Sequence, residues 1–288
     1  MQPGHAPSMR RNPDKLVRSA VFPMPQPFET IQLQIAQGIA TVTLNRPERL
    51  NSVSRPMLSE LNTALATVRM DASVRCLLLT AAGRAFCSGQ DLDDESVDPA
   101  LGPVDLGAVI EQGYRPIVLG IRDLPLPVVA AVNGVAAGAG ANIALACDVV
   151  IAARSASFVQ PFCRLGLLPG AGGTWTLPRL VGPARAMGMA LLGEPVTAVD
   201  AQAWGLIWEC VPDDRLVERA NELATRLAEG PTLAFARAKQ AIQASATQTL
   251  EASLDLEGAF LRELGGSLDY REGVAAFRAR RAARFMGG

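Results

Sequence analysis

The chain has 288 residues, of which 49% are hydrophobic and 19% charged, a composition typical of a protein with a sizeable core. A formal net charge of −1 excludes strong bulk attraction to nucleic acid or to acidic lipid, so we expect neither as a partner. The only histidine, His5, lies in the N-terminal tail, so the sequence predicts neither a Ser-His-Asp nucleophile system nor a histidine-ligated metal site.

The first 27 residues are rich in proline, have no periodic pattern and lack the continuous apolar run of a secretory signal. We expect residues 1–27 to be a disordered N-terminal extension. The five cysteines are scattered through apolar stretches without a CxxC pair, which argues against both a zinc site and a disulfide framework. A reducing, cytoplasmic location is the simplest interpretation.

The next part of the chain alternates the patterns of strands and helices. Residues 30–36 and 39–45 predict a hairpin around Gly38. Downstream, the apolar spacing predicts a helix at 57–68, a buried strand at 75–81, an acidic loop at 91–104, a helix at 106–122, a strand at 127–133, a helix opening at GAGANIALA and a strand at 147–153. Strands separated by helices indicate a parallel or mixed sheet covered by helices.

From about residue 182 onward nearly every segment has helical spacing. We therefore predict a core over residues 28–195 and a helical C-terminal module over residues 196–288. The uncharged run 124–147 is long enough to cross a bilayer, but the prolines, glycines and asparagines within it favour a buried strand, turn and helix. No membrane association is expected.

Two glycine-rich loops follow predicted strands, GRAFCSGQDL (83–92) and GVAAGAGANIALA (134–146). No strict GxGxxG occurs and neither lysine follows a glycine, so dinucleotide and Walker-type phosphate loops are not predicted. Gly89 permits a tight turn that aims the Gln90 amide, and small side chains leave the 138–140 amides accessible. Converging amides of this kind stabilise a developing negative oxygen, although each loop alone is also explained as a tight strand-to-helix connection.

Together with NRPERLNS (45–52) and LGLLPGAGGTW (165–175), these loops resemble the enoyl-CoA hydratase/isomerase (crotonase) family over about residues 28–285. With YREGVAAF (270–277), the resemblance is stronger to the phenylacetate-pathway ring-1,2-epoxyphenylacetyl-CoA isomerase branch. It implies an α/β fold built as a spiral of ββα units with a C-terminal helical trimerisation module. It also implies a homotrimer or a dimer of trimers, and a lyase or isomerase of fatty acid or phenylacetate metabolism. The resemblance further implies that coenzyme A is bound only as part of the substrate, and that the protein holds neither a prosthetic group nor a metal.

The resemblance also implies roles for individual positions. Gln90 and Ala139 match the residues whose backbone amides form the family's oxyanion hole. The implied coenzyme A contacts are Arg49 near the phosphates, the Ser88 backbone at the adenine, and Phe277 and Arg280 toward the coenzyme A of a neighbouring subunit.

The positions of the family's catalytic carboxylates carry no carboxylate in this chain. Asn142 and Phe162 stand where hydratases have glutamates, and Gly170 stands where ring-epoxide isomerases have an aspartate. Phe162 and Gly170 are therefore predicted to line the substrate pocket, and standard hydratase activity is expected to be weak or absent.

Three explanations of the missing carboxylates stay open. Another group transfers the proton, for which the candidates are Asp91, Glu111, Tyr114 and Cys163. Alternatively, water held at Asn142 carries the proton and the oxyanion hole supplies most of the catalysis. Thirdly, the protein is a non-catalytic acyl-CoA-binding homologue that acts as a sensor or as the partner of an active paralogue.

Overall fold

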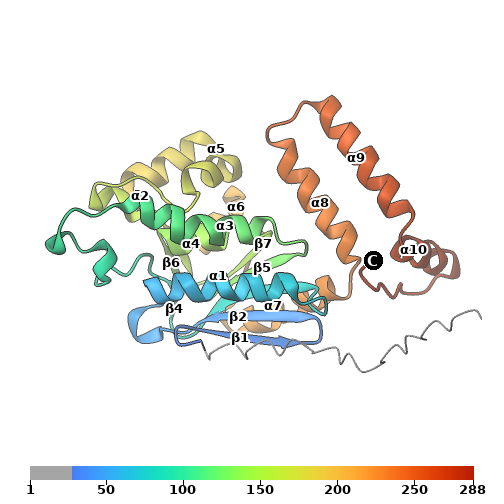
Figure 1. The fold of residues 1–288 in the computed structure, drawn as a ribbon, viewed down its shortest axis with the longest axis horizontal. Helices are drawn as coiled ribbons and strands as arrows, with labels where there is room; N and C mark the ends of the chain where they lie inside the picture. The colour runs from blue at the N-terminus through green and yellow to red at the C-terminus, as the bar shows by residue number, and fades with distance from the viewer. Residues whose placement is uncertain (1–27) are drawn as a thin grey trace, which may run out of the picture.

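Two β-sheets form the centre of the computed structural model, which describes residues 28–288 (Figure 1). The predicted disordered extension at 1–27 lies outside the described residues. The larger sheet has the strand order β1-β2-β3-β5-β7-β10 and the smaller one β4-β6-β8-β9. The strands are β1 (Ile31–Ala36), β2 (Ile39–Leu44), β3 (Cys76–Ala81), β4 (Ala85–Cys87), β5 (Val128–Val132), β6 (Val135–Ala137), β7 (Val149–Ala153), β8 (Ser157–Val159), β9 (Val196–Thr197) and β10 (Glu209–Val211).

Ten α-helices surround and extend these sheets within the described residues. They are α1 (Arg55–Met70), α2 (Leu106–Val109), α3 (Arg115–Arg122), α4 (Ala139–Leu145), α5 (Gly173–Leu192), α6 (Ala198–Trp204), α7 (Leu216–Ala228), α8 (Thr232–Ser245), α9 (Leu250–Gly265) and α10 (Leu268–Ala279). The alternation of strands and helices expected from the sequence is confirmed up to β7, whereas the short strands β4, β6 and β8 of the smaller sheet are not predicted by the sequence.

The predicted hairpin is β1 and β2, which pair in antiparallel register from Ile31 opposite Leu44 to Ala36 opposite Ile39. Gln37 and Gly38 join the strands with φ values of 52° and 77°. Two successive positive φ values belong to the two-residue turn whose twist matches that of the flanking strands. The turn therefore fixes the register that buries one face of β2 on the core.

The interior of the larger sheet is parallel, with β2, β3, β5 and β7 side by side. β5 is buried at every residue, as expected for a continuous apolar strand covered on both faces. Helix α7 packs against four of these strands, and α1 packs on α3 and β1.

The uncharged run 124–147 folds mainly as β5, β6 and α4. Within the described residues, no helix combines the length and the apolarity needed to cross a membrane.

Two short strands after residue 182 are not predicted by the sequence. β9 pairs with β8 in the smaller sheet, and β10 pairs with β7 at the edge of the larger one. Each has only two or three residues, too few for an alternating pattern to be recognised.

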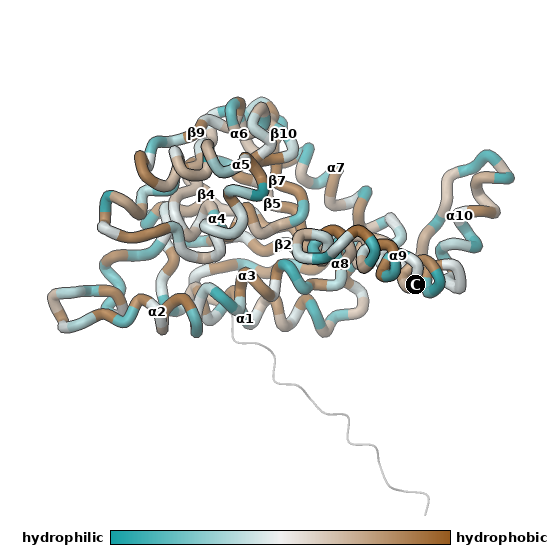
Figure 2. Tube along the Cα trace, turned by 90° about the horizontal axis from the view of Figure 1, so that it is seen from above, coloured by the Kyte–Doolittle hydropathy of each residue, from teal (hydrophilic) through white to brown (hydrophobic). Residues whose placement is uncertain are grey.

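Helices α8, α9 and α10 lie to one side of the sheets in Figure 1, and α10 also lies away from them in Figure 2. Helix α9 has no buried residue, and α8 buries only Ala236. Polar contacts attach this arm to the core at its base. The Lys239 ammonium of α8 donates to the Asp148 carboxylate and to the Ile121 carbonyl, both at 2.8 Å.

Candidate active site

The two glycine-rich loops leave the same edge of the smaller sheet. β4 and β6 are parallel neighbours, with Ala85 opposite Val135. The carboxyl ends of parallel strands meet at one edge, so the chain after Cys87 and the chain after Ala137 emerge side by side. The convergence expected from the sequence is present in the fold.

The two loops touch through positions that have no room for a side chain. A Cβ at Gly89, where φ is +97°, would lie 3.1 Å from the Ala137 carbonyl oxygen and 3.9 Å from the Ala139 nitrogen. A Cβ at Gly140 would lie 2.4 Å from the Cys87 sulfur and 2.9 Å from the Cys87 carbonyl oxygen. Glycine at both positions therefore brings the Gln90 and Ala139 peptides together.

The backbone N–H groups of Gln90 and Ala139 are both free of an acceptor among the described residues. On either side of Gln90, the Val53 N–H donates to the Gly89 carbonyl at 2.7 Å and the Asp91 N–H donates to the Val53 carbonyl at 2.9 Å. The Gln90 N–H therefore points away from Val53, because successive groups of an extended chain face opposite sides. Ala139 is the first residue of α4, where N–H groups have no partner within the helix.

Asn142 lies under the second loop and is 1% exposed. Its Nδ2 donates to the Gly170 carbonyl at 2.8 Å, and its Oδ1 accepts from Gln160 Nε2 at 2.8 Å. Gln160 is itself fully buried. Asn142 thus ties α4 to the loop that contains Gly170, and its role in proton transfer stays a prediction.

Apolar side chains surround the Cβ position of Gly170. A Cβ at Gly170 would lie 3.1 Å from Ile110 Cδ1 and 3.8 Å from Phe162 Cε1. The Phe162 ring also lies 3.5 Å from the Cβ position of Gly138, beside the Ala139 amide. Phe162 and Gly170 are therefore neighbours of the second loop. Ile110, which the sequence does not single out, completes this apolar wall.

The ionisable candidates near the loops have different surroundings. Asp91 is in an ion pair with Arg46 at 2.8 Å, and although burial raises its pKa, hydrogen bonds from Arg46, the Asp93 N–H and Ser52 hold that pKa below its ordinary value. Glu111 is exposed on the helical segment between α2 and α3. Burial raises the pKa of Tyr114, whose hydroxyl donates to the Gln90 side chain at 2.6 Å. Cys163 is half-buried, next to the Cβ position of Gly193.

The residues predicted to contact coenzyme A fall into two groups. Arg49 is exposed and pairs with Asp93 at 3.0 Å, and the Ser88 N–H donates to the Leu50 carbonyl at 3.0 Å, so both lie on the first loop's side. Phe277, 85% exposed, and Arg280 end α10, which lies at the far end of the molecule from α4 in both views (Figures 1 and 2). Within one chain these two residues do not reach the loops.

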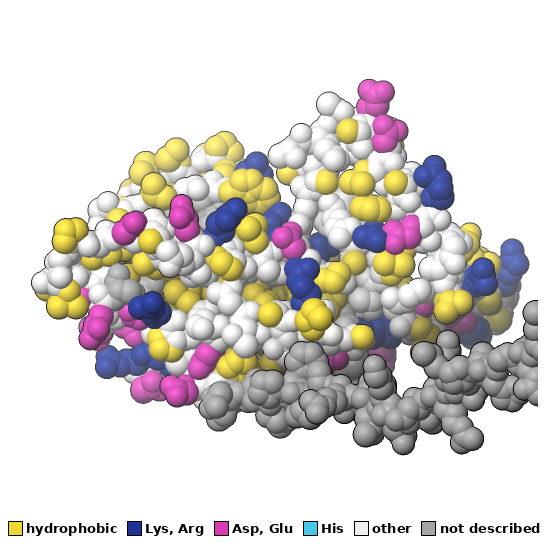
Figure 3. Space-filling model, in the orientation of Figure 1, with side chains coloured by type: hydrophobic (Ala, Val, Ile, Leu, Met, Phe, Trp, Pro, Cys, Tyr) yellow, Lys and Arg dark blue, Asp and Glu magenta, His cyan; other side chains and the backbone are white. Residues whose placement is uncertain are grey.

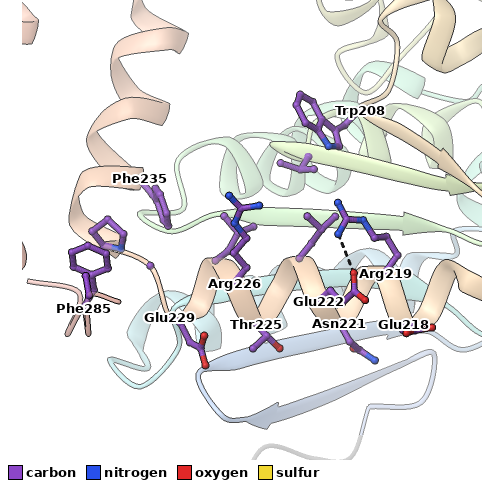
Figure 4. Close-up of a pocket in the computed structure, with 16 residues that line it drawn as sticks. Trp208, Glu218, Arg219, Asn221, Glu222, Thr225, Arg226, Glu229, Phe235 and Phe285 are labelled. Carbon is purple, nitrogen blue, oxygen red and sulfur yellow. Dashed lines mark hydrogen bonds and ion pairs between the residues drawn. The ribbon is translucent and has the colours of Figure 1, made fainter. Parts of the chain in front are cut away.

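A further groove lies away from the two glycine-rich loops. It has a volume of about 1160 Å³ and runs between α7 and the last residues of the chain (Figure 4). Figure 4 shows Trp208 and Arg219 at one end and Phe235 and Phe285 at the other, with Arg219 bound to Glu222. It contains none of the predicted site residues.

Comparisons with known proteins agree on one family. The family model described as enoyl-CoA hydratase/isomerase matches residues 34–288. The 1,2-epoxyphenylacetyl-CoA isomerase of Escherichia coli K12 is 52% identical over 90% of this chain and 99% of its own. The 2,3-dehydroadipyl-CoA hydratase of the same organism is 36% identical over 87% of this chain and 96% of its own. The crystal structure of an enoyl-CoA hydratase from Bacillus anthracis superposes with a TM-score of 0.83 at 34% identity, covering 90% of this chain and all of that one.

Proposed function

The chain belongs to the enoyl-CoA hydratase/isomerase family, and from that membership we propose that it is an enzyme acting on an acyl-CoA thioester. The Gln90 and Ala139 N–H groups hold the thioester oxygen while the neighbouring carbon loses or gains a proton. The observation that carries this proposal is the contact between the two loops, with both N–H groups unpaired among the described residues. Two preorganised donors stabilise the negative oxygen of an enolate.

Proton transfer is proposed to run without the family's usual carboxylates. Phe162, Gly170 and Ile110 make the wall beside Ala139 apolar, which suits a hydrocarbon or aromatic acyl group. Glu111 is a solvent-facing carboxylate on the adjoining helix and stays the candidate acid or base, with Asn142 as the alternative through bound water. Standard hydratase activity is proposed to be weak.

The experiment that tests this function is exchange of solvent deuterium into the Cα position of bound acyl-CoA. Saturated and arylacetyl thioesters are incubated with the protein in deuterium oxide, and mass spectrometry follows the label. Incorporation above the rate without protein supports enolate formation. Absence of incorporation across the panel contradicts the enzymatic proposal.

A non-catalytic acyl-CoA-binding role is the second candidate, because no carboxylate occupies position 142, 162 or 170. It predicts that acyl-CoA binds, as measured by isothermal calorimetry, without any isotope incorporation. The two functions are thus separated by one pair of measurements on the same protein.

Gly170→Asp is expected to raise the rate of deuterium exchange by about tenfold or more. This is less than the rate enhancement of about 10²–10⁴-fold that an evolved general acid or base provides. Gly170 does not have a positive φ, so the backbone accepts a side chain, and only Ile110 Cδ1, at 3.1 Å from the new Cβ, must move slightly. Gly170→Asn is the matched control, because it has nearly the same shape without the charge. Equal rates for the two variants would contradict a missing carboxylate as the limiting feature.

We also propose that the C-terminal helices assemble the protein into a trimer or a dimer of trimers. Hydrophobic side chains gather over α5 and along α8 and α9 on the visible face (Figure 3). Leu250, Leu254 and Leu261 of α9 are 55–76% exposed. An exposed apolar surface of this kind usually marks an interface. In such an assembly Phe277 and Arg280 would approach a neighbour's coenzyme A, and a cytoplasmic location stays part of the proposal.

Substituting both Leu254 and Leu261 by Glu is expected to reduce the assembly to single chains, as measured by light scattering. The two positions are seven residues apart and share a helix face, so the variant places two charges in one interface. Met70→Glu is the control, since Met70 is 83% exposed at the end of α1. An unchanged mass in the double variant would contradict the proposed role of α9.

A further inference from the structure

The side chain of Gln90 is held by a tyrosine from a distant part of the chain. Tyr114 Oη donates to Gln90 Oε1 at 2.6 Å, and Gln90 Nε2 donates to the Asp91 carbonyl at 3.3 Å. Tyr114 is 3% exposed. The donor is therefore shielded from solvent while Gln90 is half-buried, and a hydrogen bond at such a partly buried site is stronger than a fully exposed one.

A local irregularity in the helix places Tyr114 at this depth. Residues Ile110–Tyr114 form a π-helical turn between α2 and α3, in which the Arg115 N–H donates to the Ile110 carbonyl. Such a turn contains one extra residue, which shifts the side chains that follow, and it occurs frequently at functional sites. Asn62 of α1 donates to the Gly113 carbonyl at 3.4 Å. The turn is therefore stabilised by tertiary contacts.

The chemical state of Tyr114 suits a donor rather than a base. Burial raises the pKa of its phenol above the ordinary value, so the group keeps its proton at neutral pH. The Gln90 carboxamide oxygen accepts from it, since an amide oxygen cannot donate. The direction of the bond is thus fixed.

We propose that Tyr114 is a positioning residue that, through the Gln90 side chain, keeps the Gln90 N–H directed at the thioester oxygen. The bonds between Val53 and the residues flanking Gln90 hold the backbone on one side, and Tyr114 holds the side chain on the other. With both fixed, the peptide cannot rotate away from the Ala139 N–H. This inference rests on the proposed oxyanion hole.

The test measures the thioester carbonyl directly and does not require turnover. An acyl-CoA with a heavy-isotope label at the thioester carbon is bound to the whole protein, and difference infrared spectroscopy records its carbonyl stretch. Hydrogen bonds from both amides lower that frequency relative to free acyl-CoA. Tyr114→Phe is expected to lose about half of the lowering, because one of the two donors is misdirected.

Three further variants separate a positioning role of Tyr114 from an effect on folding. Gln90→Met removes the acceptor of the same hydrogen bond and is expected to give the same loss, and combining it with Tyr114→Phe is expected to add nothing. Tyr270→Phe, at the other tyrosine, which is 57% exposed on α10, is the matched control and should keep the full shift. Thermal unfolding midpoints confirm that each variant is folded.

The outcomes are distinct. If the wild type lowers the carbonyl frequency and Tyr114→Phe lowers it less, the positioning role is supported. If Tyr114→Phe lowers the frequency as much as the wild type does, or if the losses add in the double variant, the positioning role is overturned and the oxyanion hole is still supported. If the wild type does not lower the frequency, both the oxyanion hole and the positioning role are overturned.

Discussion

Ala139→Pro is expected to lower the rate of deuterium exchange into acyl-CoA by about 10²–10³-fold, the usual cost of losing one oxyanion-hole donor. Proline removes the backbone N–H proposed to hold the thioester oxygen. It fits the helix, because Ala139 is the first residue of α4 and proline is favoured at that position. The preceding Gly138 has ψ of −122°, outside the α region that a residue before proline must avoid.

Ala139→Gly is the matched control for this variant. It removes the methyl group and keeps the N–H, so its exchange rate should stay near that of the wild type. Binding of a saturated acyl-CoA, measured by calorimetry, should be retained by both variants, because the donor acts mainly on the charged intermediate. If Ala139→Pro exchanged as fast as Ala139→Gly, the Ala139 amide would not be part of the chemistry.

The parts of the fold that were predicted correctly are those encoded by local patterns. The hairpin of β1 and β2 follows from alternation around Gly38, and the buried strands β3, β5 and β7 follow from continuous apolar runs. The helix expected over 106–122 is present but is interrupted by the π-helical turn. The apolar spacing of residues 106–122 does not indicate this π-helical turn. The interruption is associated with contacts to Asn62 and Gln90, which lie far away in the sequence.

The convergence of the two loops was predictable because glycine is needed wherever backbones approach closely. The network below them was not, because it joins Asn142 to Gln160 and to the Gly170 carbonyl, residues 18 and 28 positions away. Nor does the sequence indicate that Ile110 faces Gly170. Side-chain partners across loops are decided by tertiary packing, and a single sequence gives no local pattern for them.

The chain has only two lysines among 27 basic residues, and one of them joins the C-terminal arm to the core. The Lys239 side chain is 7% exposed and that of Asp148 is 23% exposed. The Asp148 carboxylate also accepts from the Val128 N–H at 2.8 Å, at the start of β5. Burial raises the pKa of Asp148, and the Lys239 ammonium opposes that rise. Among the groups that favour the charged form of this carboxylate, the ammonium has the largest effect, ahead of the Val128 N–H and Arg122.

Lys239→Met is expected to lower the free energy of unfolding by about 3 kcal/mol at neutral pH. This value is at the low end of the range for removing one partner of a buried ion pair, because Asp148 keeps some contact with water. Guanidinium denaturation at a fixed protein concentration measures this loss. Without the ammonium the pKa of Asp148 rises further in the folded state, so the loss should be full at neutral pH and shrink as falling pH protonates the carboxyl. Adding Asp148→Asn should recover part of the stability at neutral pH, because the amide oxygen still accepts from Val128 and no charge is left unpaired. A Lys239→Met loss that neither low pH nor Asp148→Asn relieves would show that packing of the lysine side chain, rather than its charge, attaches α8 to the core.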